Sequence, residues 1–206
     1  MDYSVYQRRR KRWFTVLLLL ALCLAGGTVF AARNKKNEVS AYRYMINDMK
    51  LNPAAASGIM ANIYGESNFD PDIWDRTGVS YGICQWLGSR KNALYTFCTE
   101  NDLDRSTLIA QLKFMEYELE NVYPTTYQKI RNVEVSEEGA YSAAYTFCYE
   151  FERPANKAYR SEQRGGYAKD IYWPEYGAVS ANLTAAEENK GIRLSWESFA
   201  PRAYLI

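Results

Sequence analysis

Histidine is absent from this 206-residue sequence. Ser-His-Asp and Cys-His catalysis both need an imidazole base, and zinc amidases and metallopeptidases use imidazole nitrogens as their usual metal ligands. The sequence therefore excludes a Cys-His peptidase and argues against these hydrolase classes in general. No metal and no organic cofactor is implied.

Cysteine is scarce, with four residues in the chain. Cys23 lies within a long apolar run, which leaves Cys84, Cys98 and Cys148. Three cysteines allow one internal disulfide at most, and the sequence does not choose the pair. We favour the interpretation that all three are small buried hydrophobic residues.

Basic residues are in the minority once the N-terminal segment is set aside. Eight of the 25 Lys and Arg residues but only one of the 24 Asp and Glu residues precede residue 38, so the rest of the chain has a net charge of about −6. Binding of nucleic acid needs clustered positive charge to neutralise phosphates. The charge therefore argues against nucleic acid and is compatible with a glycan.

One long uncharged run occupies residues 13–32, and five consecutive basic residues, 8–12, precede it. Twenty such residues match the length needed to cross a bilayer, and a signal peptide usually has a shorter apolar region. We expect an uncleaved single-pass anchor, with residues 1–12 in the cytoplasm, 33–39 as a linker and the remainder outside the cell. Residues 29–31 resemble a cleavage site, so a secreted product is the alternative.

A helix is predicted from Pro53, because Asn52 is a good N-cap and Pro suits the first helical position. Ile59, Ile63 and Glu66 follow at helical spacing, which places Glu66 on the face that carries the two isoleucines. Burial beside apolar groups disfavours an ionised carboxyl. The pattern therefore predicts that Glu66 is a proton donor near neutral pH.

The remaining pattern is mainly helical. Caps at Ser89, Ser106 and Ser136 predict three further helices, the last ending before Pro154, with Pro124 as a break in the chain. Residues 157–172 predict a weaker helix interrupted by two glycines, and alternation between residues 72 and 86 predicts a small β-hairpin. The pattern fades in residues 177–206, which we interpret as a C-terminal tail.

Three segments, in order, carry a resemblance to a known family. They are GIMANIYGESNFDP (58–71), YGICQW (81–86) followed by Arg90, and Ala143-Ala144-Tyr145, with a further FERP run at 151–154. Together they resemble the phage tail lysozyme family, related to goose-type lysozymes and lytic transglycosylases, over roughly residues 44–176. The resemblance implies a mainly α, lysozyme-like α+β domain at residues 40–176, here preceded by one transmembrane helix.

The resemblance also implies catalytic residues. Glu66 corresponds to the general acid, and Asp75, nine residues later, is the candidate second carboxylate, with Ser80 nearby to hold a water. Asp70 and Asp72 compete for this role, although Asp70 before a proline is typical of a turn. Many transglycosylase relatives have no second carboxylate and use the substrate's acetamido group instead.

A glycan-binding cleft needs aromatic and amide groups. The candidate substrate-binding residues are Ser67, Trp74, Ser80, Tyr81, Gln85, Trp86 and Tyr145. The four aromatic residues of this set could equally be core, as most aromatic side chains are.

These features predict a membrane-anchored peptidoglycan hydrolase that cleaves the β-1,4 bond between N-acetylmuramic acid and N-acetylglucosamine. The alternatives are a lytic transglycosylase that gives 1,6-anhydro ends, an inactive peptidoglycan-binding module and a purely structural anchor protein. The anchor and the resemblance together suggest a partner in a secretion or conjugation apparatus.

Overall fold

The computed structural model describes residues 32–177, 183–188 and 191–196. The predicted cytoplasmic segment and the predicted membrane span lie outside these residues, apart from Ala32 at the end of the span. Within the described ranges, no helix combines the length and the apolar character that crossing a bilayer requires. The compact unit considered below begins at Asn34.

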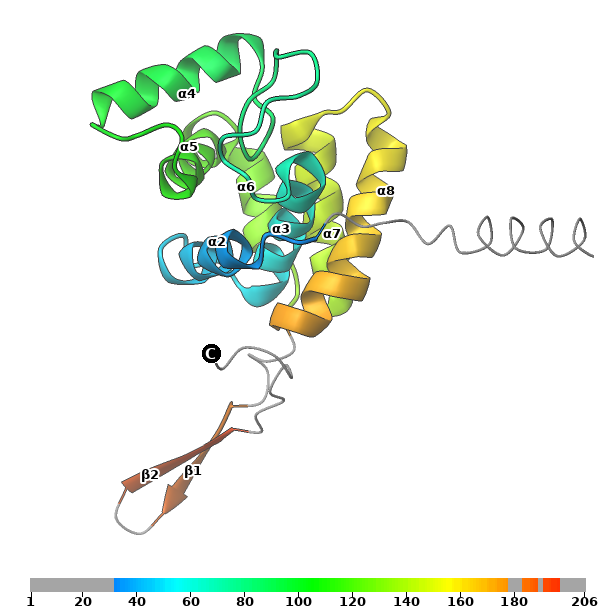
Figure 1. Cartoon of the computed structure of the whole chain (residues 1–206). Coiled ribbons are helices and arrows are strands. Elements are labelled where there is room, and N and C mark those ends of the chain that lie inside the picture. The colour runs from blue at the N-terminus through cyan, green and yellow to red at the C-terminus, as the bar shows by residue number, and fades with distance from the viewer. Residues whose placement is uncertain (1–31, 178–182, 189–190, 197–206) are drawn as a thin grey trace, which may run out of the picture. The chain divides into compact units, whose positions relative to one another are not determined.

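This unit is built almost entirely from helices (Figure 1). Two of them, α7 and α8, continue directly into the π-helices η1 and η2, and one pair of strands follows. In chain order the elements are α2 (Lys35–Asn47), α3 (Pro53–Ser67), α4 (Gly88–Glu100), α5 (Leu108–Asn121), α6 (Pro124–Arg131), α7 (Glu137–Thr146), η1 (Phe147–Glu152), α8 (Lys157–Tyr167), η2 (Ala168–Gly177), β1 (Leu183–Glu188) and β2 (Gly191–Trp196).

Helix α3 is the central element and is buried along almost its whole length. As predicted, it starts at Pro53, where the Asn52 side chain accepts a hydrogen bond from the backbone N–H of Ala55. Gly58 allows α7 to approach closely, because a Cβ there would lie 2.6 Å from atoms of Ala143 and Ala144. Helices α3 and α7 therefore pack in close contact at the centre of the domain.

The second half of the domain follows the predicted pattern with some differences. Ser136 caps α7 through the N–H of Gly139, and the helical run ends at Glu152, before Pro154. The weak helix predicted at 157–172 is longer, since α8 and η2 run to Gly177 and the two glycines at 165–166 lie inside α8. Packing against α3 and α7 stabilises α8 and η2, although their sequence pattern predicts only a weak helix.

Two predicted helix starts were displaced. The cap of α5 is Thr107 and not Ser106, and α4 has Leu87 at its cap position, with Ser89 already helical. Pro124 marks a break between helices, as predicted, since α5 ends at Asn121 and α6 begins at Pro124, where a proline at the first helical position loses no helical hydrogen bond.

The prediction of a β-hairpin between residues 72 and 86 was wrong. This segment holds only two isolated antiparallel bridges, Trp74 with Tyr81 and Tyr81 with Trp86. Gly78, Gly82 and Gln85 have positive φ angles, so the chain turns before a ladder can extend. The antiparallel strands β1 and β2 occur instead within the segment predicted as a tail, paired from Leu183 with Trp196 to Glu188 with Gly191.

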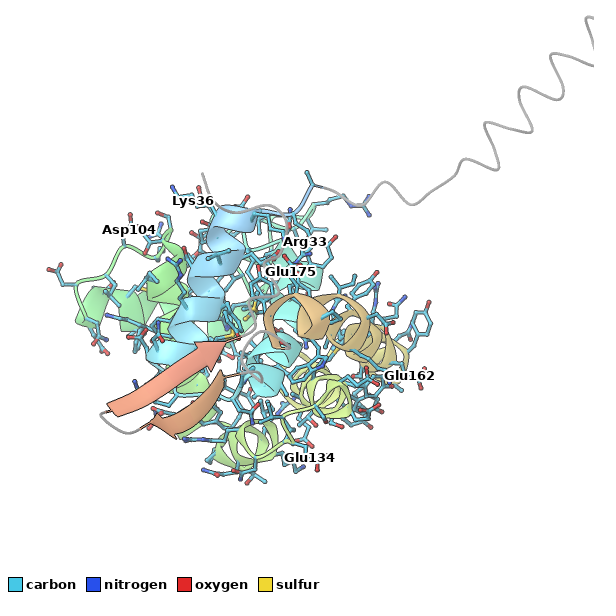
Figure 2. All side chains as sticks on the ribbon, turned by 90° about the horizontal axis from the view of Figure 1, so that it is seen from below. Arg33, Lys36, Asp104, Glu134, Glu162 and Glu175 are labelled. Carbon is cyan, nitrogen blue, oxygen red and sulfur yellow. The ribbon has the colours of Figure 1, made fainter. Side chains whose placement is uncertain are left out.

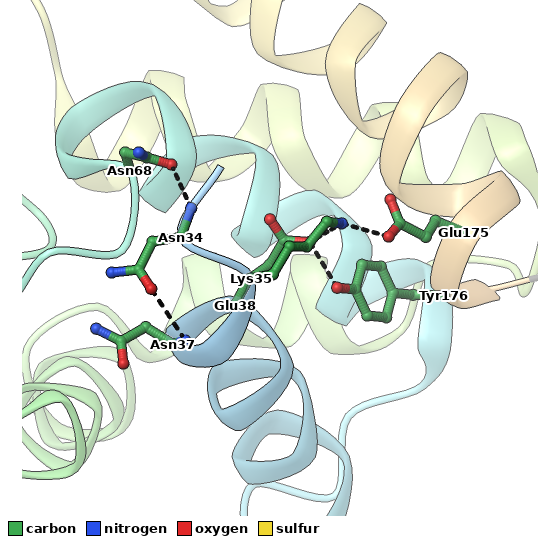
Figure 3. A network of polar contacts seen from close by, with 7 residues as sticks. All are labelled: Asn34, Lys35, Asn37, Glu38, Asn68, Glu175 and Tyr176. Atoms are coloured by element: carbon green, nitrogen blue, oxygen red, sulfur yellow. Dashed lines mark hydrogen bonds and ion pairs between the residues drawn. The ribbon is translucent and has the colours of Figure 1, made fainter. Parts of the chain in front are cut away.

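The segment predicted as a linker is the start of α2. Asn34 caps this helix through the N–H of Asn37, and its own N–H donates to the Asn68 side chain. Figure 3 shows Lys35 paired with Glu38 and with Glu175 of η2. The hydroxyl of Tyr176 donates to Glu38 as well, so polar contacts join the first described helix to the last.

Charged side chains cover the outside of the helical unit. Figure 2 shows Asp104, Glu134 and Glu162 pointing outward, and all three are exposed. The acidic character expected from composition is therefore carried in part by solvated surface carboxylates, which need no functional explanation.

Candidate active site

A cavity of about 410 Å³ opens at the C-terminal end of α3. Its walls come from separate parts of the chain, which are the ends of α3 and η1, the start of α4, the loop between α3 and α4, and the residues that precede α6 and α8. The lining residues are Glu66, Ser80, Cys84, Gln85, Trp86, Leu87, Arg90, Tyr123, Glu152, Arg153, Pro154 and Ala155.

Glu66, the predicted proton donor, lines this cavity and forms an ion pair. Its Oε1 accepts a hydrogen bond of 2.9 Å from a terminal nitrogen of Arg164 on α8, and the two side chains are 22% and 7% exposed. The guanidinium lies directly against Gly65, where an added Cβ would be 1.9 Å from its Cζ atom. Gly65 is therefore required next to Glu66 so that Arg164 can reach the carboxylate.

Ser67, predicted as substrate-binding, faces the protein interior. Its hydroxyl is buried and lies 3.0 Å from the carbonyl oxygens of both Ile63 and Ile83. The first contact is a helical back-bond, and the second joins the end of α3 to the following loop. Ser67 thus holds the loop against the helix that carries Glu66.

Gln111 of α5 anchors the same loop from the other side. Its Oε1 accepts from the N–H of Ile83 at 2.8 Å, and its Nε2 donates to the carbonyl oxygens of Pro71 and Arg105. Gly82 is needed here, because its φ is +77° and a Cβ would lie 2.4 Å from that Oε1. A fully buried amide with all of these partners fixes the loop that forms one cavity wall.

Arg90 and Glu118 form a buried polar network behind the cavity. The Glu118 carboxylate accepts from the Trp86 indole at 2.7 Å and from two nitrogens of Arg90 at 2.7 and 2.8 Å. Arg90 also donates to the carbonyl oxygen of Phe151 and lies over its ring. The network connects α4, α5 and η1, so it holds the two sides of the cavity together.

Glu152, the last residue of η1, supplies a second carboxyl to the cavity. Its Oε1 is withdrawn from solvent and has no hydrogen-bond partner among the described residues. Burial raises the pKa of Glu152 well above its usual range and the charge of Glu66 adds to this, whereas Arg90 and a hydrogen bond with the Cys84 thiol oppose it. The neutral form of this carboxyl is therefore favoured.

Asp75, the predicted second carboxylate, is bound within its own loop. Its carboxylate accepts hydrogen bonds from the hydroxyl of Thr77 and from the backbone N–H groups of Val79 and Ser80. These bonds, that of Thr77 first and that of Ser80 next, lower the pKa of Asp75 to about 2. Asp75 does not belong to the cavity lining, whereas Ser80 does.

The two competing carboxylates also make local contacts. Asp70 accepts from the N–H of Asp72, which is a turn contact, and Asp72 accepts from the hydroxyl of Tyr81. Neither lines the cavity.

The predicted aromatic residues divide between the cavity and other places. Trp86 lines the cavity but is buried, with its indole bound to Glu118, and Tyr81 is buried beneath Trp74. Trp74 is 45% exposed on the outer face of the loop, with Lys91 above its ring. Tyr145 lies away from the cavity in a stack between Tyr141 and Tyr149.

Gln85 lines the cavity and has a strained backbone conformation. Its φ is +46°, and its side-chain amide donates to the carbonyl oxygen of Gly82. The structure thus brings Glu66, Ser80, Gln85 and Trp86 together, and it leaves Ser67, Trp74, Asp75, Tyr81 and Tyr145 outside the lining.

Sequence reasoning missed Glu152 and Arg164 as site residues. Glu152 belongs to the FERP run, which contributed to the family resemblance but was given no chemical role. Arg164 lies 98 residues from Glu66, on a helix with a weak pattern, so no local signal pointed to it. A cavity with two carboxyls in different surroundings can support general acid chemistry on a glycosidic bond.

The three cysteines Cys84, Cys98 and Cys148 are free and buried, in agreement with the interpretation favoured from sequence.

A family model described as phage tail lysozyme matches residues 36–173, which is more than half of the chain. No curated protein matches the chain.

Proposed function

This chain belongs to the phage tail lysozyme family, and from that premise we propose that it cleaves the β-1,4 bond between N-acetylmuramic acid and N-acetylglucosamine in peptidoglycan. The family implies lysozyme-like glycosidase activity. The bond, the acid and the setting in the cell are our proposal. Its main support is that Glu66 lies at the end of the central helix and faces a cavity of about 410 Å³.

In the proposed mechanism, Glu66 gives its proton to the glycosidic oxygen as the bond to the anomeric carbon breaks. Arg164 orients the carboxyl through the 2.9 Å contact. Ser80 and Gln85 also line the cavity and offer polar groups that can contact hydroxyl or acetamido groups of the sugar. Water then adds to the anomeric carbon and leaves a new reducing end.

A lytic transglycosylase is the second candidate, and the surroundings of Asp75 favour it. A carboxylate that accepts three hydrogen bonds from its own loop is poorly suited to hold a nucleophilic water. Without it, the substrate's acetamido group stabilises the oxocarbenium-like centre, and the 6-hydroxyl of muramic acid replaces water. The product is then a 1,6-anhydro end.

Product analysis distinguishes these activities. Purified peptidoglycan is digested with the full chain, and the fragments are identified by mass spectrometry. New reducing ends are the expected result, and 1,6-anhydro ends would establish the transglycosylase instead. Intact glycan that is still bound by the protein would reduce the function to that of a binding module, and a chain that neither cleaves nor binds glycan would refute both proposals.

We further propose that residues 13–32 anchor the protein in the cell membrane, with residues 1–12 in the cytoplasm and the enzyme outside. The support is the uncharged run and the five basic residues before it. An enzyme held in this way suits local wall opening for a secretion or conjugation apparatus. Protease added to intact protoplasts should remove the domain, whereas a soluble product that starts near Ala32 would show that the span is a cleaved signal.

A further inference from the structure

Arg153 lines the cavity and is exposed to solvent. It directly follows the π-helix η1, and its backbone is left-handed, with a φ of +55°. This conformation is uncommon for any residue except glycine, and residues held in it cluster at binding and catalytic sites. The fold therefore tolerates backbone strain at the residue that brings this positive charge to the cavity.

Two contacts hold the Arg153 side chain in place. Its Nε donates a hydrogen bond of 2.7 Å to the carbonyl oxygen of Glu150, and its guanidinium carbon lies 5.0 Å from the centre of the Tyr123 ring, which also lines the cavity. An arginine has five N–H donors, and the bond to Glu150 uses one of them. Among the described residues, the two terminal nitrogens of Arg153 have no hydrogen-bond or ion-pair partner.

The other charged groups of the cavity lining are compensated or neutral. Two nitrogens of Arg90 are bonded to Glu118. Glu66 has its own arginine partner on α8, and burial raises the pKa of Glu152 and favours its neutral form. Within the part of the chain that the structure describes, Arg153 is therefore the cation of the lining that has no anionic partner at ion-pair distance.

A guanidinium with free terminal nitrogens is suited to bind a carboxylate through two parallel hydrogen bonds. Muramic acid differs from N-acetylglucosamine by a lactyl group on its 3-oxygen. The carboxyl of that group is either free or linked to a stem peptide, which has carboxylates of its own. A peptidoglycan strand in the cavity therefore presents a carboxylate near the bond that breaks, whereas a chitin strand presents none.

We propose that Arg153 binds a carboxylate that the muramic acid unit carries, on its lactyl group or on its stem peptide, and so selects peptidoglycan over neutral glycans. The inference rests on the proposed function. Arg153 contacts the substrate away from the reacting atoms, so its role is in specificity and not in the chemical step.

The test compares native peptidoglycan with peptidoglycan whose carboxylates have been converted to neutral methylamides, both digested by the full chain. The wild type should cleave the native substrate with a kcat/KM about tenfold higher, which corresponds to one hydrogen-bonded charge pair. The difference should lie mainly in KM, because the contact is equally strong before and during bond cleavage. Arg153→Gln should cleave both substrates as the wild type cleaves the methylamide.

The rate of Arg153→Gln on the methylamide is also the control for folding, since it should equal that of the wild type. Arg153→Lys keeps the charge but not the planar guanidinium, so it should recover only part of the preference for the native substrate. If Arg153→Gln lowers cleavage of both substrates by the same factor, or keeps the wild-type preference, the proposal is overturned.

Arg131→Gln is the matched control. Arg131 is also exposed, and its guanidinium carbon lies 5.2 Å from the centre of the Tyr127 ring, but it does not line the cavity. This variant should keep the preference for native peptidoglycan. Raising the salt concentration to about 0.5 M should weaken that preference in the wild type and in Arg131→Gln, because salt screens an exposed ion pair. Equal loss of the preference in both arginine variants would contradict a site at Arg153.

The source of the carboxylate is found with glycan strands from which an amidase has removed the stem peptides. Removal of the peptide leaves the lactyl carboxyl free. If the defect of Arg153→Gln is confined to these peptide-free strands, Arg153 binds the lactyl carboxylate. If it is confined to intact peptidoglycan, Arg153 binds the stem peptide. A variant without a defect on either substrate would overturn the proposal.

A binding measurement separates this inference from the proposed function. Calorimetry with soluble disaccharide fragments, with and without the peptide, does not require cleavage, and Arg153→Gln should bind one of them about tenfold more weakly. If the wild type releases no new ends but shows this difference, the proposed function fails and the carboxylate site remains. If the wild type cleaves peptidoglycan and Arg153→Gln binds and cleaves equally well, the proposed function stands and this inference fails.

Discussion

The outer loop of residues 72–80 and the cavity wall both carry carboxyl groups, but their hydrogen bonding differs. Asp75 in the loop accepts from one hydroxyl and two backbone N–H groups close to it in sequence. Glu66 at the cavity pairs with a residue distant in sequence, and Glu152 has an oxygen without a partner in the described chain. The loop carboxylate therefore maintains its own turn, whereas the cavity carboxyls retain capacity for a ligand.

Glu118 shows that burial alone does not decide whether a carboxyl group stabilises the fold or is a candidate for chemistry. Like Glu152 it lies near Arg90, but its two oxygens accept from the Trp86 indole and from the Arg90 guanidinium. A buried carboxylate with satisfied oxygens stabilises the fold, and one with an unsatisfied oxygen is a candidate for chemistry. Each of the following predictions tests one side of this comparison.

Glu66→Gln should have the largest effect. The amide keeps the shape of the side chain but cannot give a proton to the glycosidic oxygen, so cleavage of peptidoglycan should fall by about 10²- to 10⁴-fold. Release of reducing ends measures the rate, and circular dichroism and glycan binding confirm the fold. A loss of less than about tenfold would remove Glu66 from the role of general acid.

Glu118→Ala should mainly reduce stability. It leaves the Arg90 charge and the Trp86 indole without their acceptor, and breaking a buried pair costs about 3 to 5 kcal/mol. We expect about 3 kcal/mol, the lower end of that range, because 26% of the Arg90 side chain remains exposed. Urea unfolding measures the change.

Glu120→Ala is the matched control for Glu118→Ala, since it lies on the same helix but is exposed. Its effect should stay within about 0.5 kcal/mol. Equal effects of the two substitutions would show that the network behind the cavity does not stabilise the domain.

Gly65→Ala should lower activity more than stability. The new methyl group would overlap the Arg164 guanidinium, which must then leave Glu66. We expect roughly a tenfold loss of activity from the misplaced carboxyl and about 1 kcal/mol of overpacking. Gly166→Ala is the comparison, because no atom lies within 4 Å of its added Cβ. That variant should keep its activity and gain about 0.5 to 1 kcal/mol of helix stability.

Asp75→Asn should have the smallest effect on activity, with a loss of less than about tenfold, because the side chain serves its own loop. The substitution should instead change how the stability of the protein depends on pH. The pKa of Asp75 is lowered to about 2, so the folded carboxylate stabilises the protein above pH ~4 and that contribution is lost as the pH falls toward 2. Thermal unfolding at several pH values should show this loss in the wild type and not in Asp75→Asn. A loss of activity as large as that of Glu66→Gln would restore Asp75 to the catalytic residues.

Much of the helical architecture could be predicted because its signals are local. Asn52 with Pro53, and Ser136 before its helix, are caps whose hydrogen bonds reach only three residues along the chain. The loop between residues 72 and 86 was mispredicted, because alternating side chains suggest a strand whereas positive φ angles at Gly78, Gly82 and Gln85 turn the backbone instead. The long-range anchor of that loop, Gln111, carries no local signal.

For the site, the sequence by itself determined that Glu66 ends a buried helix beside a turn and that no histidine is available to replace it. Only the tertiary structure decided its surroundings, since Arg164, which pairs with it, and Glu152, which lines the same cavity, lie 98 and 86 positions further along the chain. Helix and cap patterns arise from neighbours within about one turn, and the sequence displays them directly. The protonation and orientation of a carboxyl depend instead on burial and on charges within a few ångströms, and these neighbours are set by how α3, η1 and α8 pack.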